Sequence, residues 1–167
     1  MELEGKTALI TGGARRVGRG ITLALARAGA NVVINYNTSA TEALETAAEA
    51  EALGVRALPV HASVSDYEQV GAMMATAVEH FGGIDILVNN ASTFKPDPLP
   101  TDDLTVWHKS IDTLVHGPFY CANQVAPIML EGDGGVIIGI GDLSAFEPWP
   151  GFAGHAVGKG AVLSLTR

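Results

Sequence analysis

The sequence is short of cysteine, of basic residues and of long apolar runs. Its single cysteine, Cys121, has no partner for an internal disulfide, so we expect a reducing, cytoplasmic location. Lys and Arg total 10 against 18 Asp and Glu, and the net charge of −8 argues against nucleic acid as a partner. No apolar stretch approaches the ~20 residues that span a bilayer, so we expect no membrane partner. The start, MELEGK, lacks a basic-then-apolar leader, and we expect no secretory signal.

What the sequence does contain is a regular alternation of apolar runs and amphipathic segments. The composition, 47% hydrophobic and 17% charged, indicates a folded domain. We expect strands at residues 6–11, 31–36, 55–60, 84–89 and 135–140. We expect helices at residues 17–29, 39–53 and 65–81, helical segments with interruptions within 101–130, and a further helix from 155 onward. Glycine closes the first helix at Gly29, and Ser65 or Asp66 is the expected N-cap of the third.

Strands alternating with helices predict an α/β fold in three layers, a doubly wound parallel sheet of the Rossmann type with strand order 3-2-1-4-5. We find no linker or repeat, so residues 1–167 are treated as one nucleotide-binding domain. The sequence stops at Arg167 inside a helical pattern without a stop signal. We therefore expect a domain truncated in the helix after the fifth strand, with its C-terminal strands missing and a sheet edge exposed.

A glycine-rich turn follows the first strand. It reads Thr11-Gly12-Gly13-Ala14-Arg15-Arg16-Val17-Gly18. Glycines such as Gly12 and Gly18 let the backbone approach a pyrophosphate, and the helix that begins at Val17 supplies free N–H groups. An ordinary tight turn is the alternative, but the position directly after the first strand of a βαβ unit favours a phosphate site.

The end of the second strand carries no carboxylate. An NAD site usually places Asp or Glu there, but this chain has Tyr36-Asn37-Thr38-Ser39. Arg15, Arg16 and Arg19 concentrate basic charge near the glycine-rich turn of an otherwise acidic protein. We expect NADP(H), whose 2′-phosphate this charge would bind; solvated surface arginines are the alternative.

These motifs resemble the short-chain dehydrogenase/reductase family. Its Thr-Gly-x3-Gly-x-Gly hallmark is present with Arg16 in place of the middle glycine, and its Asn-Asn-Ala-Gly hallmark appears with Ser92 in place of glycine. Arg16, Ser92 and the following Thr93-Phe94 are similar to the pteridine reductase branch. The second strand, VVINYN, also resembles 3-oxoacyl carrier-protein reductases.

The resemblance implies roles for residues beyond the glycine-rich turn. Arg15, Arg16, Ser39 and Ser92 would face cofactor phosphates, and Arg16 would also face substrate. The remaining cofactor positions it implies are Val17, Tyr36, Asn37, Thr38, Ser63, Val64, Asn90 and Ala91. Phe94 would stack on a flat substrate; the alternative is a loop aromatic that plugs the edge of the core. The family also implies a homodimer or homotetramer.

The catalytic positions depart from the family pattern of Ser, Tyr, Lys and Asn. Lys159 occupies the lysine position, which would hold the nicotinamide ribose. Four residues earlier stands His155 instead of Tyr, Asp142 replaces Ser, and Leu114 replaces Asn. Pteridine reductases also carry Asp at the position of Asp142, where it would contact substrate.

The altered set is still chemically capable. His155 and Lys159 share one helix face, and Asp142 follows the carboxyl end of the fifth strand, where ligands bind in such sheets. A histidine can act as general acid or base near neutral pH. We expect an NADPH-dependent reductase of a carbonyl or pterin-like substrate, with 3-oxoacyl carrier-protein reductase as one alternative. The other is a non-catalytic NADP(H)-binding protein that has lost the tyrosine. The histidines at 61, 80, 108 and 116 show no metal-like spacing, so we expect no metal.

Overall fold

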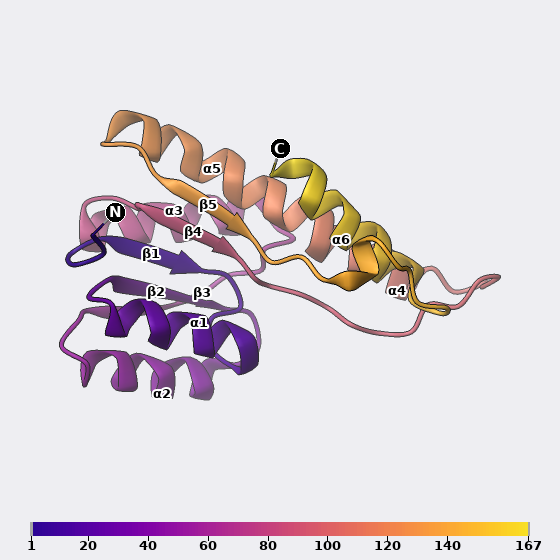
Figure 1. The fold of residues 1–167 in the computed structure, drawn as a ribbon, viewed down its shortest axis with the longest axis horizontal. Helices are drawn as coiled ribbons and strands as arrows, with labels where there is room; N and C mark the ends of the chain where they lie inside the picture. Colours follow the sequence, from indigo (N-terminus) through magenta and orange to yellow (C-terminus); the bar gives the residue numbers. More distant parts are fainter. Residues whose placement is uncertain (1, 167) are drawn as a thin grey trace.

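A parallel sheet organises the molecule. The computed structural model describes residues 2–166. The strands are β1 (Thr7–Ile10), β2 (Asn31–Tyr36), β3 (Ala57–His61), β4 (Ile86–Asn89) and β5 (Val136–Gly139). They pair in the order β3-β2-β1-β4-β5, every pair parallel, which confirms the predicted Rossmann-type fold (Figure 1).

Helices connect the strands and cover the sheet on both faces. They are α1 (Arg16–Arg27), α2 (Ala40–Glu51), α3 (Tyr67–Phe81), α4 (Thr105–Ile111), α5 (Gly117–Glu131) and α6 (Ala153–Leu165). Helices α1 and α2 lie on one side of the sheet, and α3, α5 and α6 lie on the other (Figure 1). Asp66, one of the expected N-caps, accepts a hydrogen bond from the Gln69 N–H at the start of α3.

Side chains along each strand point alternately to the two faces of the sheet, and each face forms its own hydrophobic core with the helices that cover it. Leu9, Val33 and Leu87 point towards α3 and α5, where they pack with Met73 and Val125. The intervening strand residues, Ala8, Ile10, Val32, Ile34, Ile86 and Val88, point towards α1 and α2. Because both faces of β1, β2 and β4 are covered, the middle of each strand is a continuous apolar run, as in parallel strands generally.

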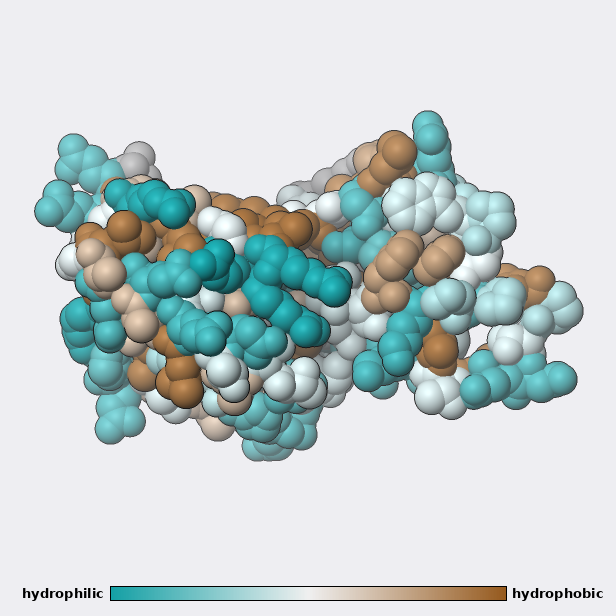
Figure 2. Space-filling model, turned by 90° about the horizontal axis from the view of Figure 1, so that it is seen from below, coloured by the Kyte–Doolittle hydropathy of each residue, from teal (hydrophilic) through white to brown (hydrophobic). Residues whose placement is uncertain are grey.

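Strand β5 is the outer strand of the described sheet and is only partly covered. Val136, Ile137 and Ile138 are 42%, 37% and 43% exposed, in agreement with the expected sheet edge. Seen from the side of α1 and α2, the surface keeps a brown, hydrophobic band among hydrophilic atoms (Figure 2).

The interrupted helix predicted within residues 101–130 divides at a turn of π-helix, Asp112–His116, between α4 and α5. This turn directs Leu114 into the core, where it is 1% exposed. A Cβ on Gly158 of α6 would collide with the Leu114 side chain, so the π-helical turn and α6 approach closely there. Turns of this kind are frequent at functional sites.

Candidate functional site

One cleft at the carboxyl ends of the strands brings together every site residue predicted from the sequence. Its volume is about 740 Å³. The predicted residues that line it are Gly12, Arg15, Arg16, Val17, Gly18, Tyr36, Asn37, Thr38, Ser39, Ser63, Val64, Asn90, Ala91, Ser92, Phe94, Asp142, His155 and Lys159. This is the edge at which open α/β sheets bind ligands.

Glycine is required at two positions of the turn between β1 and α1. Gly12 has φ +60°, which favours glycine, and a Cβ there would lie 3.1 Å from the Cα of Ala91. A Cβ on Gly18 would collide with the Gly12 carbonyl oxygen and lie 2.6 Å from Asn90 Nδ2. The turn is therefore as compact as a backbone that cradles a pyrophosphate must be, which fits a dinucleotide.

Arg16 adopts a backbone conformation that glycine prefers. Its φ of +50° lies in the left-handed region, and among residues 2–166 it is the one non-glycine residue with positive φ. A side chain in this region costs about 1–2 kcal/mol. Such strain is typical of functional sites.

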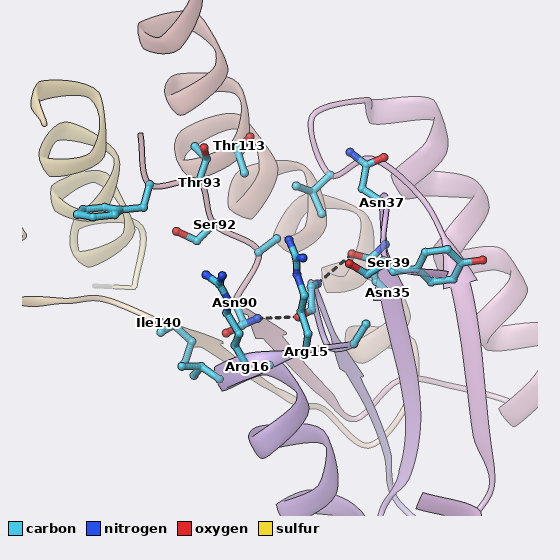
Figure 3. A pocket seen from close by; sticks show the side chains of 18 of the residues that line it. Arg15, Arg16, Asn35, Asn37, Ser39, Asn90, Ser92, Thr93, Thr113 and Ile140 are labelled. Carbon is cyan, nitrogen blue, oxygen red and sulfur yellow. Dashed lines mark hydrogen bonds between the residues drawn. The ribbon is translucent and has the colours of Figure 1, made fainter. Parts of the chain in front are cut away.

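The arginines near the turn divide into two groups. Arg15 and Arg16 reach into the cleft from the start of α1, and Asn37 and Ser39 approach from the end of β2 (Figure 3). Arg19 instead forms an exposed ion pair with Glu49 of α2, at 2.5 Å. Arg15 and Arg16, the two arginines predicted to bind the cofactor, therefore line the cleft, and Arg19 does not.

A buried hydroxyl joins the loops after β1 and β4. Thr11 is 1% exposed, and its Oγ1 accepts hydrogen bonds of 2.9 Å from the backbone N–H groups of both Asn90 and Ala91. The Asn90 side chain returns a hydrogen bond of 2.8 Å to the Thr11 carbonyl oxygen. Asn90, predicted only to line the ribose, therefore also holds the floor of the cleft together.

Asn35 braces the neighbouring loops in a similar way. Its Oδ1 accepts a hydrogen bond of 3.2 Å from the Gly12 N–H, and its Nδ2 donates one of 2.9 Å to the Ala62 carbonyl oxygen. Sequence reasoning missed Thr11 and Asn35 as supports. A polar residue at or just beyond the end of a buried strand was the available signal.

Asp142 and His155 form a pair at the other end of the cleft. The distance from His155 Nε2 to Asp142 Oδ2 is 2.7 Å, and the other ring nitrogen, Nδ1, lies 3.0 Å from the Thr93 carbonyl oxygen. The His155 side chain is only 5% exposed, whereas that of Asp142 is 35% exposed. Asp142 is therefore the member of the pair that a ligand in the cleft can reach.

The hydrogen bonds define where the protons of this pair lie. A carbonyl oxygen only accepts, so His155 Nδ1 must carry a hydrogen to bond Thr93. The contact between Nε2 and Asp142 then needs one more proton, shared between them. Burial acts to raise the pKa of Asp142, but hydrogen bonds from Ser144 and His155 outweigh it and bring the pKa below its ordinary value. The pair thus holds one transferable proton between His155 Nε2 and Asp142 Oδ2.

Lys159 lies one turn of α6 beyond His155 and is 5% exposed. Its Nζ donates a hydrogen bond of 2.6 Å to the Ile140 carbonyl oxygen, just beyond β5. Burial lowers the pKa of Lys159, and the charge of Asp142 opposes this only in part. The amine borders the cleft, in a position to hold a polar group of a ligand.

The π-helical turn presents Thr113 to the cleft, and Lys109 of α4 also lines it. The neighbouring Leu114 is turned away into the core. Sequence reasoning missed Thr113, because a π-helical turn shifts by one residue which side chains face the cleft. It also missed Lys109, which precedes this turn in α4.

Phe94 is 54% exposed, so it does not plug the edge of the core. One face of its ring stacks on Phe152, with the centroids 4.4 Å apart and the planes 7° from parallel. The His155 ring packs edge-on against it at 4.9 Å. The predicted stacking of a substrate on Phe94 would therefore need the ring face that Phe152 does not cover.

Within residues 2–166, no helix is both long and apolar enough to cross a membrane. Nor does any cluster of three or more His, Cys, Asp or Glu side chains in that range offer a metal site.

The chain was compared with known proteins. The family model for short chain dehydrogenases matches residues 6–167. The 3-oxoacyl-[acyl-carrier-protein] reductase FabG of Staphylococcus aureus strain Mu50 is 36% identical over 162 residues, 97% of this chain and 66% of that protein. The 3-oxoacyl-[acyl-carrier-protein] reductase of a Synechocystis strain is 35% identical over 165 residues, 99% of this chain and 67% of that protein. The chain thus spans about two thirds of the length of these relatives.

Solved structures agree with the sequence matches. A dehydrogenase/reductase from Sinorhizobium meliloti 1021 has a TM-score of 0.92 at 34% identity, covering 98% of this chain and 65% of that one. A second structure from the same organism has a TM-score of 0.95, also at 34% identity, covering 99% and 66%. With a family match over nearly the whole sequence, the chain belongs to the short-chain dehydrogenase family.

Proposed function

We propose that the protein containing this chain is a cytoplasmic, NADP(H)-dependent short-chain reductase of a carbonyl or pterin-like group, acting on a small molecule as a homodimer or homotetramer. The observation that carries the cofactor is the position of Arg15 and Arg16 at the start of α1, with Asn37 and Ser39 facing the same cleft and no carboxylate at the end of β2. A dianionic phosphate is attracted to this arrangement.

The residues at hand fit a nicotinamide dinucleotide. The cradle made by Gly12 and Gly18 and the N-terminus of α1 would hold the pyrophosphate. Lys159 would hold the nicotinamide ribose, beside Asp142 and His155. When bound, the reduced cofactor would supply the hydride, and the protein then has to supply a proton to the substrate oxygen or nitrogen.

The geometry favours a route for this proton through Asp142. Both ring nitrogens of His155 are engaged, one by Thr93 and one by Asp142, so the buried ring has no free nitrogen to offer to substrate. Asp142 can take the shared proton from His155 Nε2 and present it in the cleft. His155 is then the proton store and Asp142 the group that touches substrate, which sharpens the sequence-based view of His155 as the donor.

Two substrate classes have support. Relatives named as 3-oxoacyl-[acyl-carrier-protein] reductases favour a 3-oxoacyl thioester. Arg16 and the exposed ring of Phe94 favour a flat, pterin-like substrate. The direct test follows NADPH oxidation by the full-length chain with a 3-oxoacyl thioester and with a dihydropteridine, using NADH as the control cofactor. Turnover of neither substrate would reject both substrate assignments.

The cofactor assignment has its own experiment. Asn37→Asp places a carboxylate beside the proposed 2′-phosphate site, and we expect NADPH affinity to fall about tenfold or more while NADH binding holds. Fluorescence titration with both dinucleotides measures this without any need for turnover. Equal effects on the two would contradict a 2′-phosphate site.

A second function, a non-catalytic NADP(H)-binding protein, is favoured by the burial of His155 and the replacement of the catalytic asparagine by buried Leu114. This reading predicts tight NADPH binding together with no turnover across a broad panel of carbonyl and imine substrates. Catalysis lost in Asp142→Asn but present in the unmodified protein would exclude it.

A further inference from the structure

The loop after β4 is fastened to the beginning of α6, immediately beside the Asp142–His155 pair. The Thr93 carbonyl oxygen accepts the hydrogen bond from His155 Nδ1, and the next ring along the loop, Phe94, stacks on Phe152. These contacts join segments that lie far apart in the sequence. They alone leave the loop free to pivot about the aromatic stack.

Asp97 adds a rigid attachment on the far side of that stack. Its backbone N–H donates a hydrogen bond of 2.8 Å to the Gly151 carbonyl oxygen. Its Oδ2 accepts one of 2.6 Å from the backbone N–H of Gly154, in the first turn of α6. The N-cap residue of this helix, Phe152, has no side-chain acceptor, so Asp97 performs the capping from 57 positions away.

The packing around this hydrogen bond is specific for a glycine. A Cβ on Gly154 would lie 2.6 Å from Asp97 Oδ2 and 2.8 Å from the Cβ of Ser110. Gly154 directly precedes His155, so the position of the Asp97 carboxylate determines where the His155 side chain projects from the first turn of α6. Gly154 and Asp97 thus form a matched pair whose contact defines the first turn of α6.

Burying the Asp97 carboxylate costs folding free energy. Asp97 is 5% exposed, and its second oxygen, Oδ1, has no hydrogen-bond partner within the part of the chain that the structure describes. A buried acceptor without a partner costs about 1–3 kcal/mol, and more when it is charged. Helix capping alone could be provided by a serine at the N-cap position without that cost.

We propose that Asp97 is a positioning residue for the Asp142–His155 pair, an inference that rests on the proposed reductase function. It holds the loop that carries Thr93 against the first turn of α6. This keeps His155 Nδ1 on the Thr93 carbonyl oxygen and thereby keeps Nε2 directed at Asp142. Without it, the helix start and the loop can separate. A misplacement of about 1 Å in such a site costs about 10²-fold in rate.

The test compares Asp97→Ala, Asp97→Asn and a control in the full-length chain. Asp97→Ala removes the acceptor, and we expect kcat to fall about tenfold or more while the Kd for NADPH stays constant. Asp97→Asn keeps an oxygen for the Gly154 N–H and should restore kcat to within about threefold of the unmodified protein. Asp102→Ala removes an exposed carboxylate from the same loop and should change neither quantity.

A spectroscopic measurement on the histidine ring separates positioning from general support of the fold. The hydrogen-bonded N–H signals of His155, assigned by their loss in His155→Phe, should be protected from solvent exchange in the unmodified protein. They should persist in Asp97→Asn and Asp102→Ala and exchange rapidly in Asp97→Ala. Gly154→Ala, whose added Cβ would displace the carboxylate without removing it, should have the same effect on the ring, and its melting temperature separates this effect from loss of the fold.

The outcomes decide the two proposals separately. A lower melting temperature in Asp97→Ala with unchanged kcat and unchanged His155 signals would overturn the positioning role. If the unmodified protein itself reduces no substrate, the reductase proposal fails, and the exchange of the His155 N–H protons still decides whether Asp97 positions the ring.

Discussion

His155 Nε2 lies 2.7 Å from Asp142 Oδ2, and both side chains border the cleft. The ring is buried and the carboxylate is accessible, so in the proposed mechanism Asp142 is the member of the pair that exchanges a proton with a ligand in the cleft.

Removing either member of the pair should stop catalysis but leave cofactor binding intact. We expect Asp142→Asn and His155→Phe each to lower kcat by about 10²-fold or more, since general acid–base catalysis contributes about 10²–10⁴-fold. Steady-state kinetics and NADPH titration measure the two effects. Asp112 and His116 form an exposed pair at 3.2 Å that offers a matched control, and His116→Phe should leave kcat unchanged. Full activity in His155→Phe would remove the ring from the mechanism.

Lys159 should make stability depend on pH in the alkaline range. Burial lowers its pKa below 10.5, so above the folded-state value the unfolded chain binds more protons than the folded one. The free energy of unfolding of the unmodified protein should therefore rise, relative to Lys159→Met, as pH increases towards 10.5. Urea unfolding across this range gives the difference, with Lys109→Met as the control for removal of an exposed lysine charge. A constant difference would contradict the buried amine.

Replacing Arg16 with glycine should raise the stability of the fold and weaken NADPH binding. Arg16→Gly relieves a left-handed conformation that costs about 1–2 kcal/mol, but glycine regains about 0.4–1 kcal/mol of unfolded-state freedom. We expect the free energy of unfolding to rise by up to about 1 kcal/mol and the Kd for NADPH to increase about tenfold. Arg16→Ala is the matched variant, because it removes the guanidinium but keeps the strain. Denaturant titration and NADPH fluorescence should then show the same loss of affinity without the gain in stability.

Cys121 should resist thiol reagents in the folded protein. It is fully buried between the sheet and the α3 and α5 helices, and burial raises the pKa of its thiol to about 12. Reaction with a chromogenic disulfide should track global unfolding, so its rate should rise with denaturant in parallel with the loss of helical signal. Rapid labelling under native conditions would show that this core opens locally.

The sequence allowed the architecture and the outline of the cleft to be predicted, because both follow from local patterns. Alternating apolar runs and helical periodicity were sufficient for β1 to β5, and the glycine spacing around Gly12 predicted the compact turn after β1. Helix ends shifted by a few residues, as when α6 began at Ala153 instead of 155, because caps depend on contacts that are distant in sequence.

Contacts between distant segments could not be predicted. The hydrogen bond from Gly154 to Asp97 joins α6 to a distant loop, and no sequence pattern indicates that these segments meet. Likewise, the contact between His155 Nδ1 and the Thr93 carbonyl oxygen exists only because folding brings the two residues together. The π-helical turn is a third example, since it exchanges Leu114 for Thr113 at the cleft without a recognisable sequence signal.

The hydroxyl of Thr11 has a consequence for how fast a ligand can bind. Because one oxygen holds the backbone of both Asn90 and Ala91 to the end of β1, the two loops that form the floor of the cleft cannot part without exposing buried polar groups. The floor is therefore already in its final shape before a dinucleotide arrives, and little entropy is lost there on association. Dinucleotide binding should follow a single exponential, and the observed rate should rise linearly with dinucleotide concentration. Loop closure would instead make this rate reach a plateau, and we expect such a plateau in Thr11→Val.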